Sequence, residues 1–471
     1  AALGLALTVL SQPATANETL KRSVEEALAK TPSKAKLGVR FETLEGKVLY
    51  ERDSQVPLTP ASNMKLLTTT TALARLGPDF QHETRLVLAG GRQSGKVHTG
   101  DMWLIGGGDP TLSFRFDKAP LLGSVVTAFR AAGIKKVEGG LVVDARVFDE
   151  VRLHPSWEAS DAEHWYGAEV SGLVLNDNCL DVTVKGGPVA TMEPFTEYVR
   201  LLLEAKSTPE RNKHNFSILR TESDKRTISI RGKVWTKSTG LTRSIPVPDP
   251  AAFYAVVLRG RLGMSGIEVT GRIRKAGAEE AAPEGFTLWR RTAPLLRTLG
   301  VINQRSHNLY AECVFKTLGR LDPQGKGAEL KRQGSWPRGA EVVTRFLCSD
   351  LGLPAAEVTV SDGSGLSRDN LASPRALCRV LRAALSGPNA EHFAASMARP
   401  GEEGTLKRRL KTLPEGVSVR AKTGTLTGVS ALSGVIERGK ERVVFSLLIN
   451  GPGASRRHLD PILLAAANAL R

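Results

Sequence analysis

Residues 59–65 of the chain read Thr-Pro-Ala-Ser-Asn-Met-Lys, and the interpretation of the fold starts from this stretch. Proline suits the first turn of a helix, and the largely apolar run from Leu66 to Leu76 is long enough for a buried helix. Gly77-Pro78 then ends the helix. Ser62 and Lys65 are three residues apart, so we expect them on one helix face.

This pair of residues suits nucleophilic catalysis. A serine hydroxyl is a poor nucleophile until another group removes its proton, and a lysine amine can do so when its pKa is lowered by burial. The start of a helix also presents free N–H groups and a positive dipole end to an oxyanion. Because Ser-x-x-Lys is short enough to arise by chance, the interpretation depends on motifs later in the chain.

Two later stretches complete a set of three motifs. Ser306-His307-Asn308 lies in a predicted helix over residues 304–318, and Lys422-Thr423-Gly424 ends a strand predicted to begin at Val417. Ser-x-x-Lys, Ser-x-Asn and Lys-Thr-Gly, in this order, resemble the three signatures of penicillin-binding proteins and serine β-lactamases.

The spacing of the motifs indicates inserted domains. Ser306 and Lys422 are 116 residues apart, as in a compact serine β-lactamase, whereas Ser62 and Ser306 are 244 residues apart. We therefore predict an α+β fold, in which a transpeptidase-like domain with an antiparallel sheet and helices is interrupted by inserted β-rich domains. The predicted parts are a signal-peptide remnant at 1–16, a discontinuous catalytic domain at 17–90 and 286–471, an inserted domain at 91–190 and 250–285, and a small basic β-rich domain at 191–249.

This arrangement is similar to one family in particular, the class C low-molecular-mass penicillin-binding proteins of the S13 peptidase family. These are D-alanyl-D-alanine carboxypeptidases and endopeptidases. Three further stretches fit the family, namely Gly-Asp-Pro-Thr-Leu at 108–112, Asn-Asp-Asn-Cys at 176–179 and Asp-Gly-Ser-Gly-Leu-Ser-Arg at 362–368. The resemblance extends over nearly the whole mature chain.

The resemblance implies catalytic roles for three residues. Ser62 would attack the carbonyl carbon between two D-alanines and form an acyl-enzyme, with Lys65 accepting its proton. Ser306 would relay a proton to the leaving amine. The backbone N–H groups of Ser62 and Thr425 would form the oxyanion hole.

The resemblance also implies a set of substrate-binding residues. Asn308 would hydrogen-bond the substrate amide, while Lys422 and Thr423 would bind the terminal carboxylate. Gly424 would leave room for the substrate backbone beside the strand. Arg368 and Asp161 are candidates for reading the substrate side chain, because family members that read diaminopimelate use a loop acid and an arginine there. His307 is expected to be incidental.

Charge and the N-terminus indicate an exported protein. The net charge of +17 and the isoelectric point near 9.9 favour a polyanionic partner or surface. Residues 1–10 are almost wholly apolar, and Ala14-Thr15-Ala16 resembles a signal-peptidase site. We therefore expect a periplasmic or cell-wall-associated protein with peripheral contact to wall or membrane.

Residues 206–246 carry ten basic and three acidic residues, and no RNA-binding pattern of aromatics and glycines accompanies them, so nucleic acid is not an expected partner.

Neither a metal nor another cofactor is predicted. The cysteines lie at positions 179, 313, 348 and 378 without a C-x-x-C pattern, and no His-x-x-x-His occurs. Two alternatives remain open for the cysteines, a Cys348–Cys378 disulfide or buried free thiols.

The sequence therefore predicts a serine D-Ala-D-Ala carboxypeptidase and endopeptidase that acts on peptidoglycan stem peptides and is acylated by β-lactam antibiotics. One alternative is a serine β-lactamase, which the long insert and the lack of an obvious second base for deacylation disfavour. The other is an inactive cell-wall-binding scaffold, which the intact motifs disfavour. The balance between the two peptidase activities, the diamino acid that is read and the oligomeric state are left open.

Overall fold

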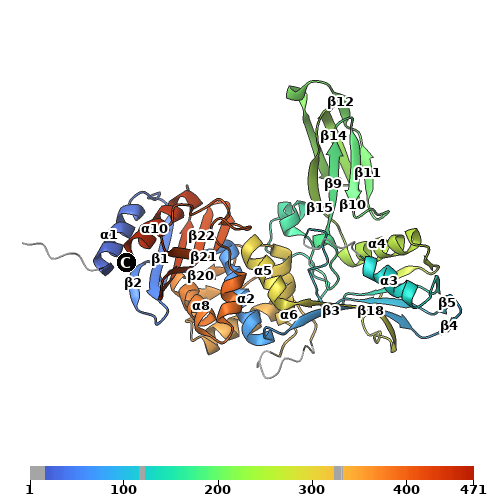
Figure 1. Ribbon diagram of the computed structural model, residues 1–471, viewed down its shortest axis with the longest axis horizontal. Coiled ribbons are helices and arrows are strands. Elements are labelled where there is room, and N and C mark those ends of the chain that lie inside the picture. Colours follow the sequence, from blue (N-terminus) through green and yellow to red (C-terminus); the bar gives the residue numbers. More distant parts are fainter. Residues whose placement is uncertain (1–15, 116–121, 323–329, 331, 471) are drawn as a thin grey trace, which may run out of the picture.

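The computed structural model describes residues 16–115, 122–322, 330 and 332–470. The molecule is elongated, with a catalytic body formed by both ends of the chain, a second body formed by its middle, and a narrow β-rich unit that projects from the second body (Figure 1). The predicted signal-peptide remnant at 1–16 lies, apart from Ala16, outside the described residues. Within the described part, no helix combines the length and apolarity that crossing a membrane requires.

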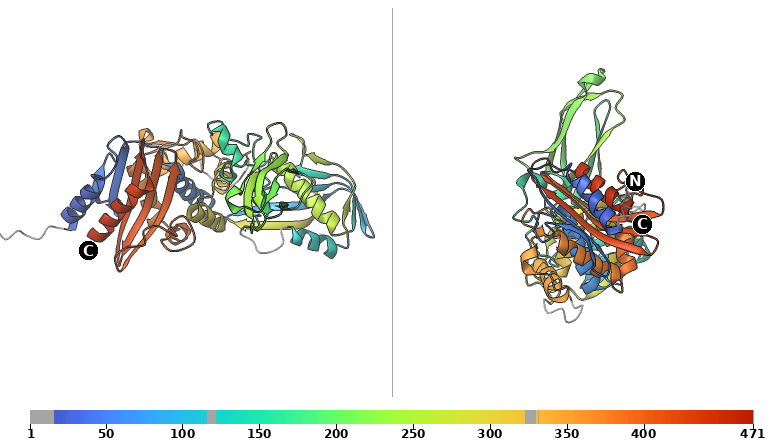
Figure 2. Two further views of the ribbon diagram at one scale, coloured as in Figure 1. Left: turned by 90° about the horizontal axis from the view of Figure 1, so that it is seen from above. Right: turned by 90° about the vertical axis from the view of Figure 1, so that its left-hand side faces the viewer.

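A five-stranded antiparallel sheet forms the centre of the catalytic body, in the order β2-β1-β23-β22-β21. Its strands are β1 (Lys36–Thr43), β2 (Val48–Arg52), β21 (Val417–Leu426), β22 (Val429–Arg438) and β23 (Glu441–Asn450). Phe41 on β1 lies opposite Phe445 on β23, so the sheet joins the two ends of the sequence. On one face of the sheet, α1 (Ala16–Leu28) and α10 (Arg456–Ala469) pack side by side (Figure 2).

Helices cover the other face and form the largest apolar core. The central one is α2 (Met64–Leu76), which follows a 3₁₀ turn over Ala61–Asn63 and is buried on nearly all sides. Two of its buried threonines satisfy their hydroxyls locally, since those of Thr69 and Thr71 donate to backbone carbonyls four residues earlier. Around α2 lie α5 (Leu295–Arg305), α6 (Asn308–Leu318), α7 (Trp336–Arg345), α8 (Pro374–Ser386) and α9 (Ala390–Ser396), with the short pair β19 (Val358–Thr359) and β20 (Leu371–Ala372).

Two predicted helices differ from the observed ones at a boundary. The helix predicted over 304–318 begins within α5, and the chain breaks at Ser306, whose φ of 60° is left-handed. A left-handed residue cannot continue a right-handed helix, so α6 starts anew at Asn308. The last helix begins at Arg456 with Ser455 as its cap, and Pro461 lies inside it. The apolar run over residues 461–471 predicts a closing helix that starts at Pro461, and this predicted start is therefore wrong.

The second body is built on two sheets with helices α3 (Gly123–Ala131) and α4 (Pro250–Met264). The larger sheet has the order β17-β8-β6-β3-β18, and its strands are β3 (Gln81–Ala89), β6 (Met102–Ile105), β8 (Leu141–Asp144), β17 (Ile273–Lys275) and β18 (Gly285–Pro294). β6, β8 and β17 run parallel, so their carboxyl ends meet at one edge. The smaller sheet contains β4 (Arg92–Ser94), β5 (Val97–Thr99), β7 (Lys136–Glu138) and β16 (Glu268–Val269).

The projecting unit also has two sheets (Figure 1). One contains β9 (Cys179–Lys185), β10 (Val189–Glu193) and β15 (Leu241–Pro246), and the other contains β11 (Arg200–Leu203), β12 (Lys206–Thr208), β13 (Asn215–Arg220) and β14 (Thr227–Trp235).

The strand pairing indicates boundaries between the bodies that differ somewhat from the domain boundaries expected from the sequence. β3 and β18 pair with each other inside the sheet of the second body, although the expected catalytic domain included residues 81–90 and 286–294. We therefore propose that the inserted part begins at residue 81 and ends at residue 294. In the same way, β9 pairs with β10 and β15, so we propose residues 179–246 as the small unit.

The four cysteines are free thiols. The disulfide alternative for Cys348 and Cys378 is therefore wrong. The buried-thiol alternative holds for Cys179, Cys313 and Cys378, while Cys348 is half-buried.

Candidate active site

Ser62 and Lys65 lie where the 3₁₀ turn passes into α2. Lys65 Nζ lies 2.9 Å from Ser62 Oγ, so the two side chains share one face of this turn. The same nitrogen donates to Asn308 Oδ1 and to the carbonyl oxygen of Ser364, both at 2.7 Å. The amine is thus held at the serine by groups from two other segments.

Burial changes the charge state of Lys65. The side chain is fully buried, and burial lowers its pKa from the usual value near 10.5 to about 7, although Glu312 and Asp362 act in the opposite direction. Removing a charged group from water disfavours its charged form. Near neutral pH, a large fraction of Lys65 is therefore an uncharged amine that can accept the proton of Ser62.

Ser306 and Lys422 form a second serine–lysine pair. Lys422 on β21 is fully buried, and its Nζ donates to Ser306 Oγ at 2.8 Å and to the carbonyl oxygen of Thr423 at 2.8 Å. Burial lowers the pKa of Lys422 well below its usual value, and the charge of Lys65 lowers it further. The left-handed backbone of Ser306 is a conformation that non-glycine residues adopt at some cost, and such residues gather at functional sites.

Asn308 connects the two motifs on helices α2 and α6. Its Oδ1 accepts from Lys65, and its Nδ2 donates to the carbonyl oxygen of Tyr166 at 3.0 Å. Both ends of the amide therefore contact protein groups in this structure.

Gly424 of the third motif lies too close to the turn that carries Ser62 to have room for a side chain. A Cβ at Gly424 would lie 2.7 Å from the carbonyl oxygen of Pro60 and 3.1 Å from the backbone nitrogen of Ser62. The turn that carries Ser62 thus approaches the strand closely at this position, and the expected room for the substrate backbone stays a prediction. Beside it, Thr423 is buried and Thr425 is exposed.

A cleft of about 630 Å³ opens above these residues. Its lining includes Ser62, Ser306, Asn308 and Thr425, together with Arg368 and Asp161. Lys65, Lys422, Thr423 and Gly424 are absent from this lining and lie beneath or beside it. The structure therefore gathers all ten residues predicted from the sequence in and around one cleft.

Arg368 and Asp161, the two residues predicted to read the substrate side chain, both contact Glu158. Arg368 donates to Glu158 Oε1 at 3.3 Å and to the carbonyl oxygen of Thr427 at 3.1 Å. Asp161 accepts from the backbone nitrogen of Glu158, and burial raises the pKa of Asp161. Glu158 therefore stands between the predicted arginine and the predicted acid, and sequence reasoning did not single it out.

The most important residue that sequence reasoning missed is Glu312 on α6. It is fully buried and accepts from Trp336 Nε1 at 2.8 Å, from Gly363 N at 3.0 Å and from Ser364 N at 2.7 Å. Burial raises the pKa of Glu312 to about 7, and the neighbouring Asp362 raises it as well. A signal existed in the sequence, because Glu312 lies four residues after Asn308 and therefore on the same face of the predicted helix.

His307 is not a freely exposed side chain between Ser306 and Asn308. Its Nε2 lies 3.2 Å from Asp177 Oδ2, and its ring packs against Trp165 and Tyr310. The histidine thus links the second motif to the inserted body, and its expected lack of a role in the reaction stays a prediction.

Comparison with known proteins agrees with this geometry. The model of the D-Ala-D-Ala carboxypeptidase 3 (S13) family matches residues 20–468. The D-alanyl-D-alanine carboxypeptidase of an Actinomadura species is 32% identical, covering 92% of this chain and 79% of that protein. The D-alanyl-D-alanine carboxypeptidase DacB of Haemophilus influenzae is 24% identical, covering 91% and 88%.

Among solved structures, penicillin binding protein 4 (dacB) from Haemophilus influenzae has the same fold. Its TM-score is 0.76 at 23% identity, covering 94% of this chain and 98% of that chain. The family match over nearly all of the described residues, together with the 32% identity, establishes the family of the chain. The chain belongs to the D-Ala-D-Ala carboxypeptidase 3 (S13) family.

Proposed function

We propose that the chain acts on peptidoglycan stem peptides through an acyl-enzyme on Ser62. Its family makes it a serine-type D-Ala-D-Ala carboxypeptidase. The observation that carries the proposed mechanism is the buried Lys65 amine, 2.9 Å from the hydroxyl of Ser62. Burial keeps this amine partly uncharged near neutral pH, as a proton acceptor requires.

The acylation step moves one proton and exchanges one bond. Lys65 accepts the hydroxyl proton while Ser62 Oγ bonds to the carbonyl carbon between the two D-alanines. The oxyanion that forms would accept hydrogen bonds from the backbone nitrogens of Ser62 and Thr425. When the carbon–nitrogen bond breaks, the proton held by Lys65 returns to the leaving amine through Ser306, which takes up one proton as it gives its own, and the contact of Ser306 with Lys422 fixes it for that task. Water then hydrolyses the ester and frees Ser62.

The substrate would lie along β21. We propose that Thr423 and Lys422 favour its terminal carboxylate, and that Asn308 is the partner of its amide. At the far end of the cleft, Arg368 and Asp161 offer a cation and an acid. Such a pair suits a side chain that carries both an ammonium and a carboxylate, as a diamino acid of the stem peptide does.

The two alternatives are not favoured. A serine β-lactamase would need fast hydrolysis of the acyl-enzyme, and a scaffold would not need two buried lysines held against serines. Endopeptidase cleavage of cross-links uses the same cleft and the same bond type, so we include it in the proposal.

The test is the intact mass of the protein after brief exposure to benzylpenicillin, followed by peptide mapping. We expect a stable penicilloyl adduct on Ser62 that is absent from Ser62→Ala. Rapid loss of the drug without an adduct would favour a β-lactamase, and an untouched drug would favour the scaffold. With the adduct established, release of D-alanine from a stem pentapeptide measures the carboxypeptidase directly.

We also propose that the protein is exported and that the projecting unit contacts an anionic wall polymer. Lys206 on β12 lies directly opposite Lys233 on β14, and like charges in such positions destabilise a sheet. The guanidinium of Arg211 lies 5.4 Å from the ring centre of Trp235 beside them. A partner with negative charge would offset the repulsion between these two lysines at the exposed end of the sheet.

A further inference from the structure

A second hollow lies between the catalytic body and the inserted body. It has a volume of about 1040 Å³, which is larger than the catalytic cleft. None of the described residues that line it also lines the cleft. One wall is the edge of the five-stranded sheet where β6, β8 and β17 end, and the opposite wall follows the end of α6. The crevice outside the carboxyl ends of parallel strands is where open α/β sheets bind ligands.

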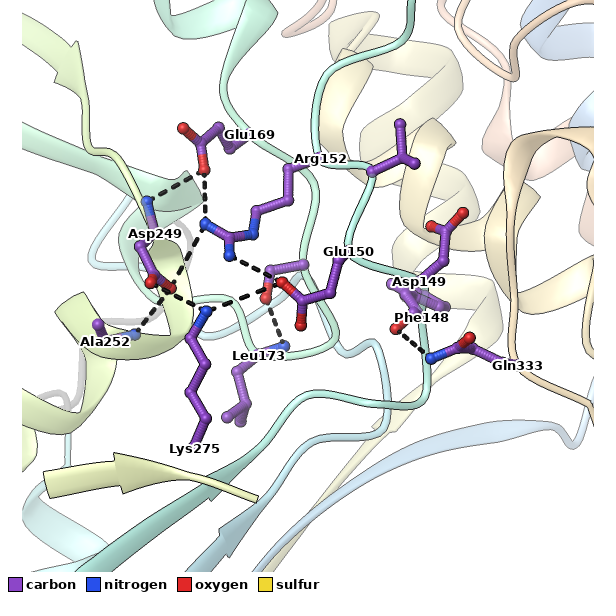
Figure 3. A network of polar contacts seen from close by, with 12 residues as sticks. Phe148, Asp149, Glu150, Arg152, Glu169, Leu173, Asp249, Ala252, Lys275 and Gln333 are labelled. Carbon is purple, nitrogen blue, oxygen red and sulfur yellow. Dashed lines mark hydrogen bonds and ion pairs between the residues drawn. The ribbon is translucent and has the colours of Figure 1, made fainter. Parts of the chain in front are cut away.

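Three of the four carboxylates that line this crevice, all except Glu279, already have cationic partners among the described residues. Asp144 pairs with Arg146 at 2.7 Å, and Glu83 pairs with Arg85 at 3.2 Å. Figure 3 shows Glu150 facing both Arg152 and Lys275, at 2.9 and 3.7 Å. These acids are therefore not available to neutralise a further cation.

Arg320, like Arg332, is a cation of the crevice that lacks such a partner among the described residues. Its guanidinium is half-buried, its Nε has no hydrogen-bond partner there, and its Nη2 donates only to the carbonyl oxygen of Leu330 at 3.3 Å. Burial lowers the pKa of Arg320, and no carboxylate of the described residues counteracts this effect. A cation removed from water without an acid is costly, so the site favours an anion.

His82 adds a second unused group in the same crevice. The side chain is 1% exposed, its Nδ1 lies 3.4 Å from the carbonyl oxygen of Gly107, and its Nε2 has no partner among the described residues. A carbonyl accepts only, so Nδ1 carries the proton and Nε2 is left as an acceptor. Burial lowers the pKa of His82 and outweighs the opposing effects of Asp109 and of the hydrogen bond to Gly107, while the charge of Arg320 lowers the pKa further, which keeps the ring neutral. The site therefore offers one fork of cationic donors beside one neutral acceptor.

We propose that this crevice binds the carboxyl-terminal end of a peptide, with Arg320 holding the carboxylate and His82 Nε2 accepting the last amide N–H. The planar guanidinium matches a carboxylate with two parallel hydrogen bonds. A bare anion would use Arg320 alone, whereas the end of a peptide uses both groups. The proposal rests on the proposed function for the source of the peptide, since trimmed stem peptides end in such a carboxylate.

The test is calorimetric titration of the full chain with N-acetyl-D-alanine after benzylpenicillin has blocked Ser62. We expect binding to the blocked protein, weaker binding of acetate, which lacks the N–H, and a loss of about tenfold or more in Arg320→Gln. Arg320→Lys should lose part of the affinity because it keeps the charge without the fork. Arg345→Gln, an exposed arginine on α7, makes the same charge change and should bind as the unaltered protein does.

Equal binding by Arg320→Gln, or no binding to the blocked protein, would overturn the proposal. The thermal midpoint of each variant shows whether it is folded, and Arg320→Lys remains informative if Arg320→Gln is not. The mass of the penicilloyl adduct is measured on the same samples. A missing adduct concerns the function of Ser62, whereas Arg320-independent binding concerns only the crevice.

Discussion

Replacing Glu312 with glutamine removes one buried negative charge near Lys65 and keeps the size of the side chain. The carboxylate favours the charged form of the lysine, so its loss should lower the pKa of Lys65 below the present value of about 7. Lys65 accepts a proton only as the free amine. The rise of the acylation rate with pH should therefore move to lower pH in Glu312→Gln.

The hydrogen bonds set the size of this shift. Lys65 Nζ lies 2.7 Å from the carbonyl oxygen of Ser364, and Ser364 N lies 2.7 Å from Glu312 Oε1. Since the nitrogen and oxygen of one residue are at most about 3.6 Å apart, the two charges lie within about 9 Å of each other. At an effective dielectric constant of about 20, they interact by at least about 1.8 kcal/mol. One pKa unit corresponds to about 1.4 kcal/mol, so a fully ionised Glu312 accounts for about 1.3 units. Because the pKa of Glu312 is itself raised to about 7, the midpoint should fall by up to about that amount.

The assay is the second-order rate constant of acylation by a fluorescent penicillin, measured between about pH 5 and 9 to span the titration of Lys65. Glu357→Gln is the matched control, because Glu357 is also buried and hydrogen-bonded, to Ser373 and Arg375, but does not shift the pKa of Lys65. Both variants should lose stability, since an amide cannot accept from every donor that faced the carboxylate. A midpoint that stays in place or rises in Glu312→Gln, with the control unchanged, would refute the reasoning.

Three further outcomes are expected. Ser306→Ala should slow acylation by about 100- to 10,000-fold with little change in the thermal midpoint, and a rate near that of the unaltered protein would remove this hydroxyl from the chemistry. Gly424→Ala should displace the turn of the nucleophile and abolish acylation while the fold remains, whereas Gly260→Ala, with open space around its Cβ, should acylate normally; equal rates would contradict the close approach. Exchanging Lys206 and Lys233 for glutamine should weaken sedimentation with an anionic wall polymer and make it less sensitive to salt, while stabilising the sheet by about 0.2–1 kcal/mol; unchanged co-sedimentation would count against the polymer contact.

Short-range patterns predicted the parts of the fold that depend on neighbours in the sequence. The helix from 66 to 76 and the strand that begins at Val417 were placed from periodicity and turn residues, and the structure has elements there. The edges between the bodies could not be placed in this way. Whether β3 belongs to one body or the other depends on its pairing with β18, which is about two hundred residues away along the chain.

The sequence by itself determined the chemical inventory of this protein. It identified the serine, the lysines and their order along the chain, the long insert between the first two motifs, and the excess of basic residues. These properties need no geometry, because residue type alone decides which groups can act as nucleophile, base or anion partner.

Only the tertiary structure decided how those groups behave. It brought Glu312 and Asp362 to Lys65, broke the chain at Ser306, tied His307 to Asp177, and left Arg320 without an acid among the described residues. The physical reason is that pKa values and hydrogen bonds depend on burial and on distances of a few ångströms between segments far apart in sequence. No local pattern carries that information, since packing sets it.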